Sequence, residues 1–211
     1  MRFTTIFFDV DDTLYPASSG LWQTIRERIT IYMRERLHIP KEDVSALRKK
    51  LYEQYGTTLK GLEQHYTFDR KDFLAFVHDV DLKKYIQPDE NLRAVLKSLP
   101  TKKIIFTNAD EAHAKRITAA LGVGDCFDGI VDTNRLFPHC KPERPAFEFA
   151  MSVAGETNPR QCVMIDDLAW TTKAARELGM FSILAGHKDH GNNADAVLND
   201  WRELKSVISN Q

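Results

Sequence analysis

Hydrophobic and polar positions divide the chain into two kinds of segment. Short apolar runs, rich in β-branched and aromatic residues, occupy positions 3–10, 102–106, 129–131, 162–166 and 181–185. Runs of this kind are typical of buried strands. Apolar residues recur at helical spacing between them, over residues 111–123, 145–155 and 171–180. This alternation indicates an α/β fold with a doubly wound, Rossmann-like parallel sheet. The pattern adds a last edge strand at 196–198 and a closing helix at 200–208.

Residues 18–99 have a different pattern. Four segments, 21–37, 41–56, 69–80 and 88–99, show helical spacing, and no strand pattern occurs among them. The segment 21–37 carries Leu21, Ile25, Ile29 and Leu37 on one stripe with charges opposite. Phe68, Phe73 and Phe76 are expected to form the core of this helical block. Because the block follows the first strand, we expect an α/β core domain at 1–17 and 100–211, with a helical domain inserted at 18–99.

Charge and composition exclude several function classes. A net charge of −1 gives no electrostatic footprint for a nucleic acid polymer or an anionic membrane surface. No apolar stretch approaches the length of a membrane span. Cys126, Cys140 and Cys162 are an odd number without C-x-x-C spacing, which favours reduced thiols in a cytoplasmic protein. His187 and His190 are expected to lie in a loop, not in a metal site.

Polar side chains follow the predicted strands at the points where they end. Because the carboxyl ends of parallel strands meet at one edge of the sheet, these residues are expected to gather there: Asp9, Asp11, Thr107, Asn108, Asp166 and Asp167, with Lys141 from a loop. Clustered carboxylates are costly unless a cation holds them, and Mg²⁺ prefers such oxygen ligands. Asp12 is expected to be a turn residue that points elsewhere.

One aspartate of such a cluster can attack phosphorus and form an aspartyl-phosphate. A second aspartate two residues later can protonate the leaving alcohol and then take a proton from water. Thr107 and Lys141 can bind the phosphoryl oxygens, where charge develops in the transition state. The pattern therefore predicts phosphoryl transfer from a small phosphate ester.

Four motifs in order, "DVDDT" (9–13), "TN" (107–108), the Lys of "CKPE" (141) and "IDD" (165–167), resemble those of the haloacid dehalogenase superfamily. The resemblance implies that Asp9 is the nucleophile, Asp11 the general acid/base, and Thr107 and Lys141 the phosphate-binding residues. It also implies Mg²⁺ held by Asp9, the backbone carbonyl of Asp11 and Asp167, with Asp166 nearby. Halide leaves without a proton and dehalogenases of this superfamily lack an acid at the position of Asp11, so the resemblance favours a phosphatase.

A narrower resemblance concerns substrate. "DTLYP" (12–16), "GTTLKGL" (56–62) and "KKIIFTNADEAHAKRI" (102–117) are similar to the pyrimidine 5′-nucleotidase branch, and the inserted block matches the superfamily's helical cap. A substrate such as UMP or CMP is implied, with Asn108, Thr57 and Thr58 as binding residues. "GTT" favours a turn over a helix terminus. Helix capping is an equal alternative for Thr57 and Thr58.

The last acidic motif departs from the superfamily pattern. "DDLAWT" places Leu168 and Thr171 where related sequences often have Ser and Asn, which puts catalytic efficiency in question. Other functions stay open: a phosphatase for a sugar phosphate or pyridoxal phosphate, a phosphosugar mutase, or a non-catalytic regulatory protein. The sequence predicts a small-molecule phosphate ester as partner and gives no oligomeric state.

Overall fold

A computed structural model describes residues 2–186 and 191–209 of the chain. The chain divides into two compact units, residues 1–19 with 86–211, called the core unit here, and residues 20–85, called the helical unit. Helix α5 (Glu90–Ser98) belongs to the core unit, so the second boundary lies at residue 85, not near residue 99. The loop predicted at His187 and His190 falls outside the described residues.

The core unit contains a parallel sheet with the order β3-β2-β1-β4-β5-β6, six strands in the described part of the chain. Their bounds are β1 Thr5–Phe8, β2 Lys102–Phe106, β3 Gly129–Val131, β4 Cys162–Asp166, β5 Phe181–Ala185 and β6 Ala196–Leu198. The chain extends the sheet from β1 through β2 to β3, and then returns to the other side of β1 with β4. This order confirms the predicted doubly wound fold, including the edge strand at 196–198.

Register aligns the carboxyl ends of the three central strands. Phe8 is opposite Ile105 on β2 and Ile165 on β4. The residues that follow these positions, Asp9, Phe106 and Asp166, therefore lie at the same level of the sheet. The first strand has buried side chains at every position, as expected for a strand covered on both faces.

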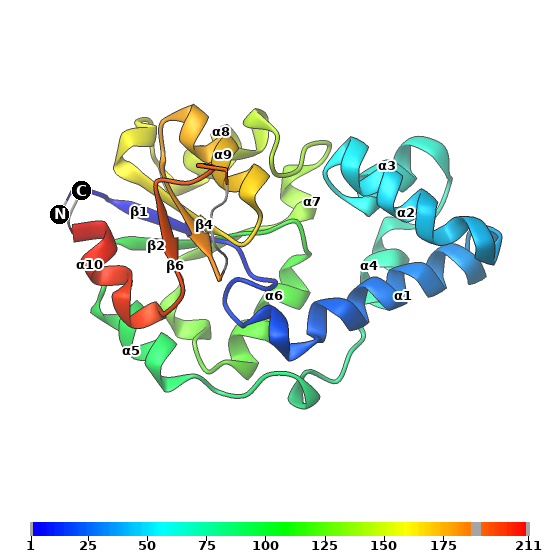
Figure 1. The fold of residues 1–211 in the computed structure, drawn as a ribbon, viewed down its shortest axis with the longest axis horizontal. Coiled ribbons are helices and arrows are strands. Elements are labelled where there is room, and N and C mark those ends of the chain that lie inside the picture. The colour runs from blue at the N-terminus through cyan, green and yellow to red at the C-terminus, as the bar shows by residue number, and fades with distance from the viewer. Residues whose placement is uncertain (1, 187–190, 210–211) are drawn as a thin grey trace. The chain divides into compact units, whose positions relative to one another are not determined.

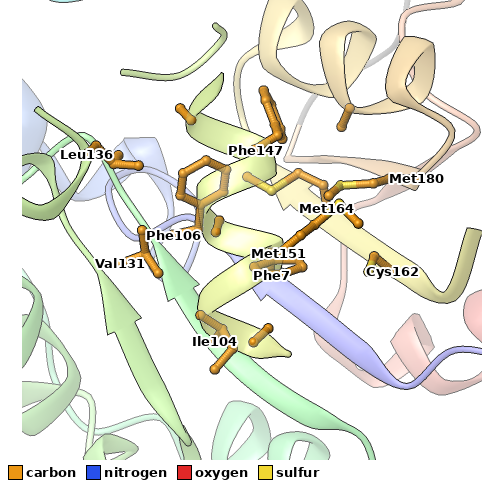
Figure 2. Packing of buried hydrophobic residues seen from close by; sticks show 14 residues of the cluster. Phe7, Ile104, Phe106, Val131, Leu136, Phe147, Met151, Cys162, Met164 and Met180 are labelled. Atoms are coloured by element: carbon orange, nitrogen blue, oxygen red, sulfur yellow. The ribbon is translucent and has the colours of Figure 1, made fainter. Parts of the chain in front are cut away.

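Helices cover both faces of this sheet (Figure 1). On one face lie α8 (Arg144–Ala154) and α9 (Ala169–Leu178), and on the other lie α5, α6 (Glu111–Ala120) and α10 (Leu204–Ser209). A further short helix, α7 (Thr133–Leu136), follows β3. Figure 2 shows the α8 side of the core, where Phe147 and Met151 pack on Phe7, Ile104, Phe106 and Met164 of the strands. Burial of these side chains is the main favourable term that holds the sheet and α8 together.

The helical unit consists of α1 (Leu21–Glu35), α2 (Lys41–Tyr55), α3 (Thr58–His65) and α4 (Arg70–His78). Rings of Phe68, Phe73 and Phe76 surround Tyr32 at centroid distances of 6.1, 5.0 and 5.5 Å. The predicted aromatic core is confirmed for Phe73, which is buried with Tyr32, whereas Phe68 and Phe76 are half-buried. Helices α2 and α3 approach so closely that a Cβ on Gly61 would lie 2.6 Å from the Leu51 Cβ. All residues of this unit are described, and none forms a strand, as predicted.

The expectation of a turn at "GTT" was wrong. Gly56 ends α2 with φ at 82°, a conformation that favours glycine, and Thr57 is the N-cap of α3. The Thr57 hydroxyl accepts a hydrogen bond from the Lys60 N–H at 3.0 Å. Two helices therefore meet at this sequence because a C-terminal glycine and an N-cap threonine are adjacent. Among the described residues, no helix is both long and apolar enough to cross a membrane.

Candidate active site

The site begins with a nucleophile candidate at the end of β1. The Asp9 N–H donates to the Ile165 carbonyl at 2.9 Å, so the strand pairing continues one residue beyond β1 and fixes the Asp9 backbone. Asp9 is buried, with 7% of its surface exposed, as are Asp166 and Lys141. The predicted meeting of the acidic strand ends is therefore present in the structure.

Lys141 lies between two of these carboxylates. Its Nζ donates to Asp9 Oδ1 and to Asp166 Oδ2, each at 2.6 Å. A charged amine buried this deeply needs such partners, and removing either carboxylate would leave it poorly compensated. Burial lowers the pKa of Lys141, but the charges of Asp166 and Asp9 outweigh it, and the net pKa is raised. Lys141 is therefore a fixed positive charge beside the Asp9 carboxylate.

Asn108 holds Lys141 in place from the neighbouring strand end. Its side-chain amide donates to the Lys141 carbonyl at 3.0 Å, and its side-chain oxygen accepts from the Lys141 N–H at 2.9 Å. Both polar atoms of the Asn108 side chain are therefore bonded to the main chain of Lys141. A substrate contact from the same side chain, as the sequence predicted, stays untested.

Thr13 connects the first and last motifs. Its hydroxyl oxygen accepts from the Asp167 N–H at 3.0 Å and lies 3.3 Å from Asp9 Oδ2 and 3.4 Å from Asp167 Oδ1. The Asp166 carboxylate is in turn held by the Leu168 N–H at 2.9 Å. Leu168 therefore supports the acidic loop through its main chain, a role that does not need the Ser of related sequences.

Three carboxylates, those of Asp9, Asp166 and Asp167, each offer an oxygen within 4.8 Å of the others. Burial raises the pKa of Asp9 to about 7, with neighbouring carboxylates adding to the effect and Lys141 opposing it. Burial, followed by the charges of Asp166 and Asp9, raises the pKa of Asp167 to about 9. One lysine is thus too little positive charge for this cluster. The all-oxygen donor set fits a hard divalent cation such as Mg²⁺.

Asp11 has partners that the sequence did not reveal. Its Oδ1 accepts from the Tyr15 hydroxyl at 2.7 Å and lies 2.8 Å from His113 Nε2. The His113 side chain is fully buried in the core unit, and Tyr15 is 2% exposed. Burial, then the charge of Asp11, raises the pKa of Tyr15, so its hydroxyl stays protonated. His113 could have been suspected because it lies four residues before Ile117 on the buried stripe of α6.

Residues 3–179 match the family model of the haloacid dehalogenase-like hydrolases. The chain belongs to this family.

Individual proteins are similar to this chain in sequence or in fold. The chain is 28% identical over 217 residues to "Phosphate metabolism protein 8" of Saccharomyces cerevisiae, covering 96% of this chain and 68% of that protein. A HAD phosphatase from Thermococcus onnurineus superposes with a TM-score of 0.66 at 17% identity, over 97% of both chains. A β-phosphoglucomutase from Clostridium difficile gives 0.63 at 18% identity, over 99% of this chain and 96% of the other. At such identities the two structures establish the fold alone.

The remaining residues singled out from the sequence are two strand-end or turn residues, Thr107 and Asp12, and two threonines at the start of α3. Thr107 is buried, and its hydroxyl oxygen accepts from the Ala109 N–H at 3.0 Å in the turn after β2. Asp12 lies in the turn after β1 with φ at 55°, as its prediction as a turn residue requires. Thr57 caps α3, which confirms the capping role predicted for it, and Thr58 is buried in the first turn of that helix. The substrate contacts of Thr57 and Thr58 stay predictions.

Thr171, where related sequences often have Asn, does not take over the polar contacts of that Asn. Thr171, which replaces the common Asn, is fully buried in α9. Its hydroxyl makes no hydrogen bond to any described residue. The polar function of an Asn at this position is therefore not reproduced by Thr171, while Asn108 and Leu168 hold Lys141 and Asp166 from elsewhere.

Proposed function

We propose that this hydrolase is a Mg²⁺-dependent phosphatase that cleaves a pyrimidine nucleoside 5′-monophosphate, such as UMP or CMP, through an aspartyl-phosphate on Asp9. The observation that carries the proposal is the buried bridge of Lys141 between Asp9 and Asp166, with Asp167 beside it at the carboxyl edge of the sheet. A fixed ammonium beside a carboxylate suits attack on a phosphate dianion, because the ammonium offsets the repulsion between the two anions.

Asp9 is assigned the attack on phosphorus, which breaks the bond to the leaving oxygen. Asp11, two residues later, gives its proton to that oxygen and then accepts a proton from the water that hydrolyses the aspartyl-phosphate. Lys141 and the hydroxyl of Thr107 are assigned to the phosphoryl oxygens. The residues that would hold Mg²⁺ are Asp9, Asp166 and Asp167, with the backbone carbonyl of Asp11. A bound cation would supply positive charge that keeps these carboxylates ionised beside the phosphate.

Asp11 favours a phosphatase over a dehalogenase. The Asp11 carboxyl accepts a hydrogen bond from Tyr15 and lies against His113, so its orientation is fixed. A fixed acid is useful where the leaving group must be protonated, as an alcohol must be, and has no role in the departure of halide, which needs no proton. The pyrimidine nucleotide is the more specific part of the proposal. It rests on the resemblance of residues 56–62 and 102–117 to the nucleotidase branch.

Phosphate release from a substrate panel tests the proposal. UMP, CMP, purine nucleotides, glucose 6-phosphate and pyridoxal phosphate would be compared with and without Mg²⁺, beside Asp9→Asn. We expect Mg²⁺-dependent turnover led by UMP or CMP, and a loss of about 10³-fold or more in the variant. Turnover led by sugar phosphates or pyridoxal phosphate would refute the substrate and keep the chemistry. Conversion of a hexose 1-phosphate to its 6-phosphate without phosphate release would identify a mutase.

A further inference from the structure

We infer that Tyr15 and His113 are positioning residues that hold the side chain of Asp11 in one orientation for proton transfer to the leaving group. This inference rests on the proposed phosphatase function and assigns to it two residues that its motifs do not include. All three residues belong to the core unit.

The three side chains come from separate parts of that unit. Asp11 and Tyr15 lie on the turn after β1, four residues apart, and His113 lies in the first turn of α6, 102 positions away from Asp11. Asp110, the N-cap of α6, accepts from the His113 N–H at 2.9 Å and so fixes the start of the helix that carries the imidazole. The imidazole position is thus set by α6 and not by the active-site turn.

Both contacts converge on the same oxygen. The Tyr15 hydroxyl donates to Asp11 Oδ1, and Nε2 of the fully buried His113 is at hydrogen-bond distance from that atom. A short aspartate side chain held at one oxygen by two buried groups loses the freedom to turn about its χ angles.

This arrangement has a specific kinetic consequence. Up to departure of the leaving group, only the protonation of the leaving oxygen depends on the orientation of Asp11, whereas attack by Asp9 and phosphate binding by Lys141 do not. A leaving group that departs as a stable anion, such as p-nitrophenolate, needs no proton. The leaving oxygen of an alcohol or of a weakly acidic phenol needs a proton, because its anion is a poor leaving group. Loss of positioning therefore slows poor leaving groups more than good ones.

The test is kcat/KM with Mg²⁺ for p-nitrophenyl phosphate, phenyl phosphate and the best nucleoside monophosphate, which reports the reaction up to departure of the first product. Tyr15→Phe removes the hydroxyl and keeps the ring. We expect kcat/KM to fall at least about 10-fold more for phenyl phosphate and the nucleotide than for p-nitrophenyl phosphate, as loss of general acid catalysis implies. His113→Leu should have the same signature, and His113→Gln, which can place an amide donor near Nε2, should recover part of it.

Tyr32→Phe is the matched control, because the Tyr32 hydroxyl also donates to a carboxylate, that of Asp72 at 3.0 Å in the helical unit. It should leave the leaving-group dependence unchanged. A uniform loss over all three substrates in Tyr15→Phe would show a purely structural role and overturn the inference, as would a gain in activity. Wild-type protein inactive on every phosphate ester would overturn the proposed function itself, so the two failures are distinguishable.

Discussion

Replacing Asp167 by Asn should make the metal-free protein more stable at neutral and alkaline pH. Asp167 shares its site with Asp9 and Asp166, and burial together with these charges raises its pKa to about 9. In the unfolded chain an aspartate titrates near 3.8. Folding therefore favours the protonated form, and the ionised carboxylate costs stability that an amide does not.

The sign and size follow from this difference in pKa. Below about pH 4 the Asp167 carboxyl is protonated in both states, so its charge contributes no difference. As pH rises from there toward about 9, the wild type should lose free energy of unfolding relative to Asp167→Asn. The slope is at most about 1.4 kcal/mol per pH unit, the value for one proton. The hydrogen bond between the main-chain N–H of residue 167 and Thr13 is retained in the variant.

Mg²⁺ should reduce this stability difference between the wild type and the variant. A ligand at 100 times its dissociation constant stabilises the folded state by about 2.7 kcal/mol, and the wild type should bind the cation more tightly than the variant. Urea unfolding of chelator-treated protein from pH 5 to 8, with and without Mg²⁺, measures both effects. Asp79→Asn, at a side chain that is 85% exposed and lies outside the acidic cluster, is the control for the amide substitution itself. A difference that is flat with pH, or one that Mg²⁺ does not reduce, would refute the reasoning.

Three further predictions concern packing, positioning and capping. Phe147→Ala should lower the free energy of unfolding by about 3–5 kcal/mol because its ring is 1% exposed, whereas Phe149→Ala on the same helix, at 37% exposure, should cost below about 1.5 kcal/mol in urea titrations. Asn108→Ala should reduce kcat up to about 100-fold by releasing the Lys141 main chain. Asn108→Asp should not restore it, since a carboxylate oxygen would face the Lys141 carbonyl. Thr57→Ala should cost about 1 kcal/mol of stability and Thr57→Asp should restore it; a raised KM in the stable Asp variant would then reveal a substrate contact.

The sequence by itself determined the layout of the core unit. Apolar runs at β1, β2, β4 and β5 are long and uniform enough to be buried strands, and the helical spacing between them left a parallel sheet as the consistent arrangement. The same logic placed the acidic strand ends at one edge, where Asp9 and Asp166 are found with Lys141 between them. These features depend on local periodicity and on chain order, both of which a sequence displays.

Tertiary structure alone decided which side chains hold the site together. The Asn108 bonds to Lys141 span 33 residues, and the contact of His113 with Asp11 spans 102. Such pairs depend on strand register and on the rotation of α6 about its axis, neither of which follows from spacing along the chain. The turn predicted at "GTT" was wrong because glycine and threonine are common both in turns and at helix ends. Here Gly56 ends one helix and Thr57 caps the next. Periodicity thus specifies elements, whereas the geometry between elements specifies the partners of Asp11 and Lys141.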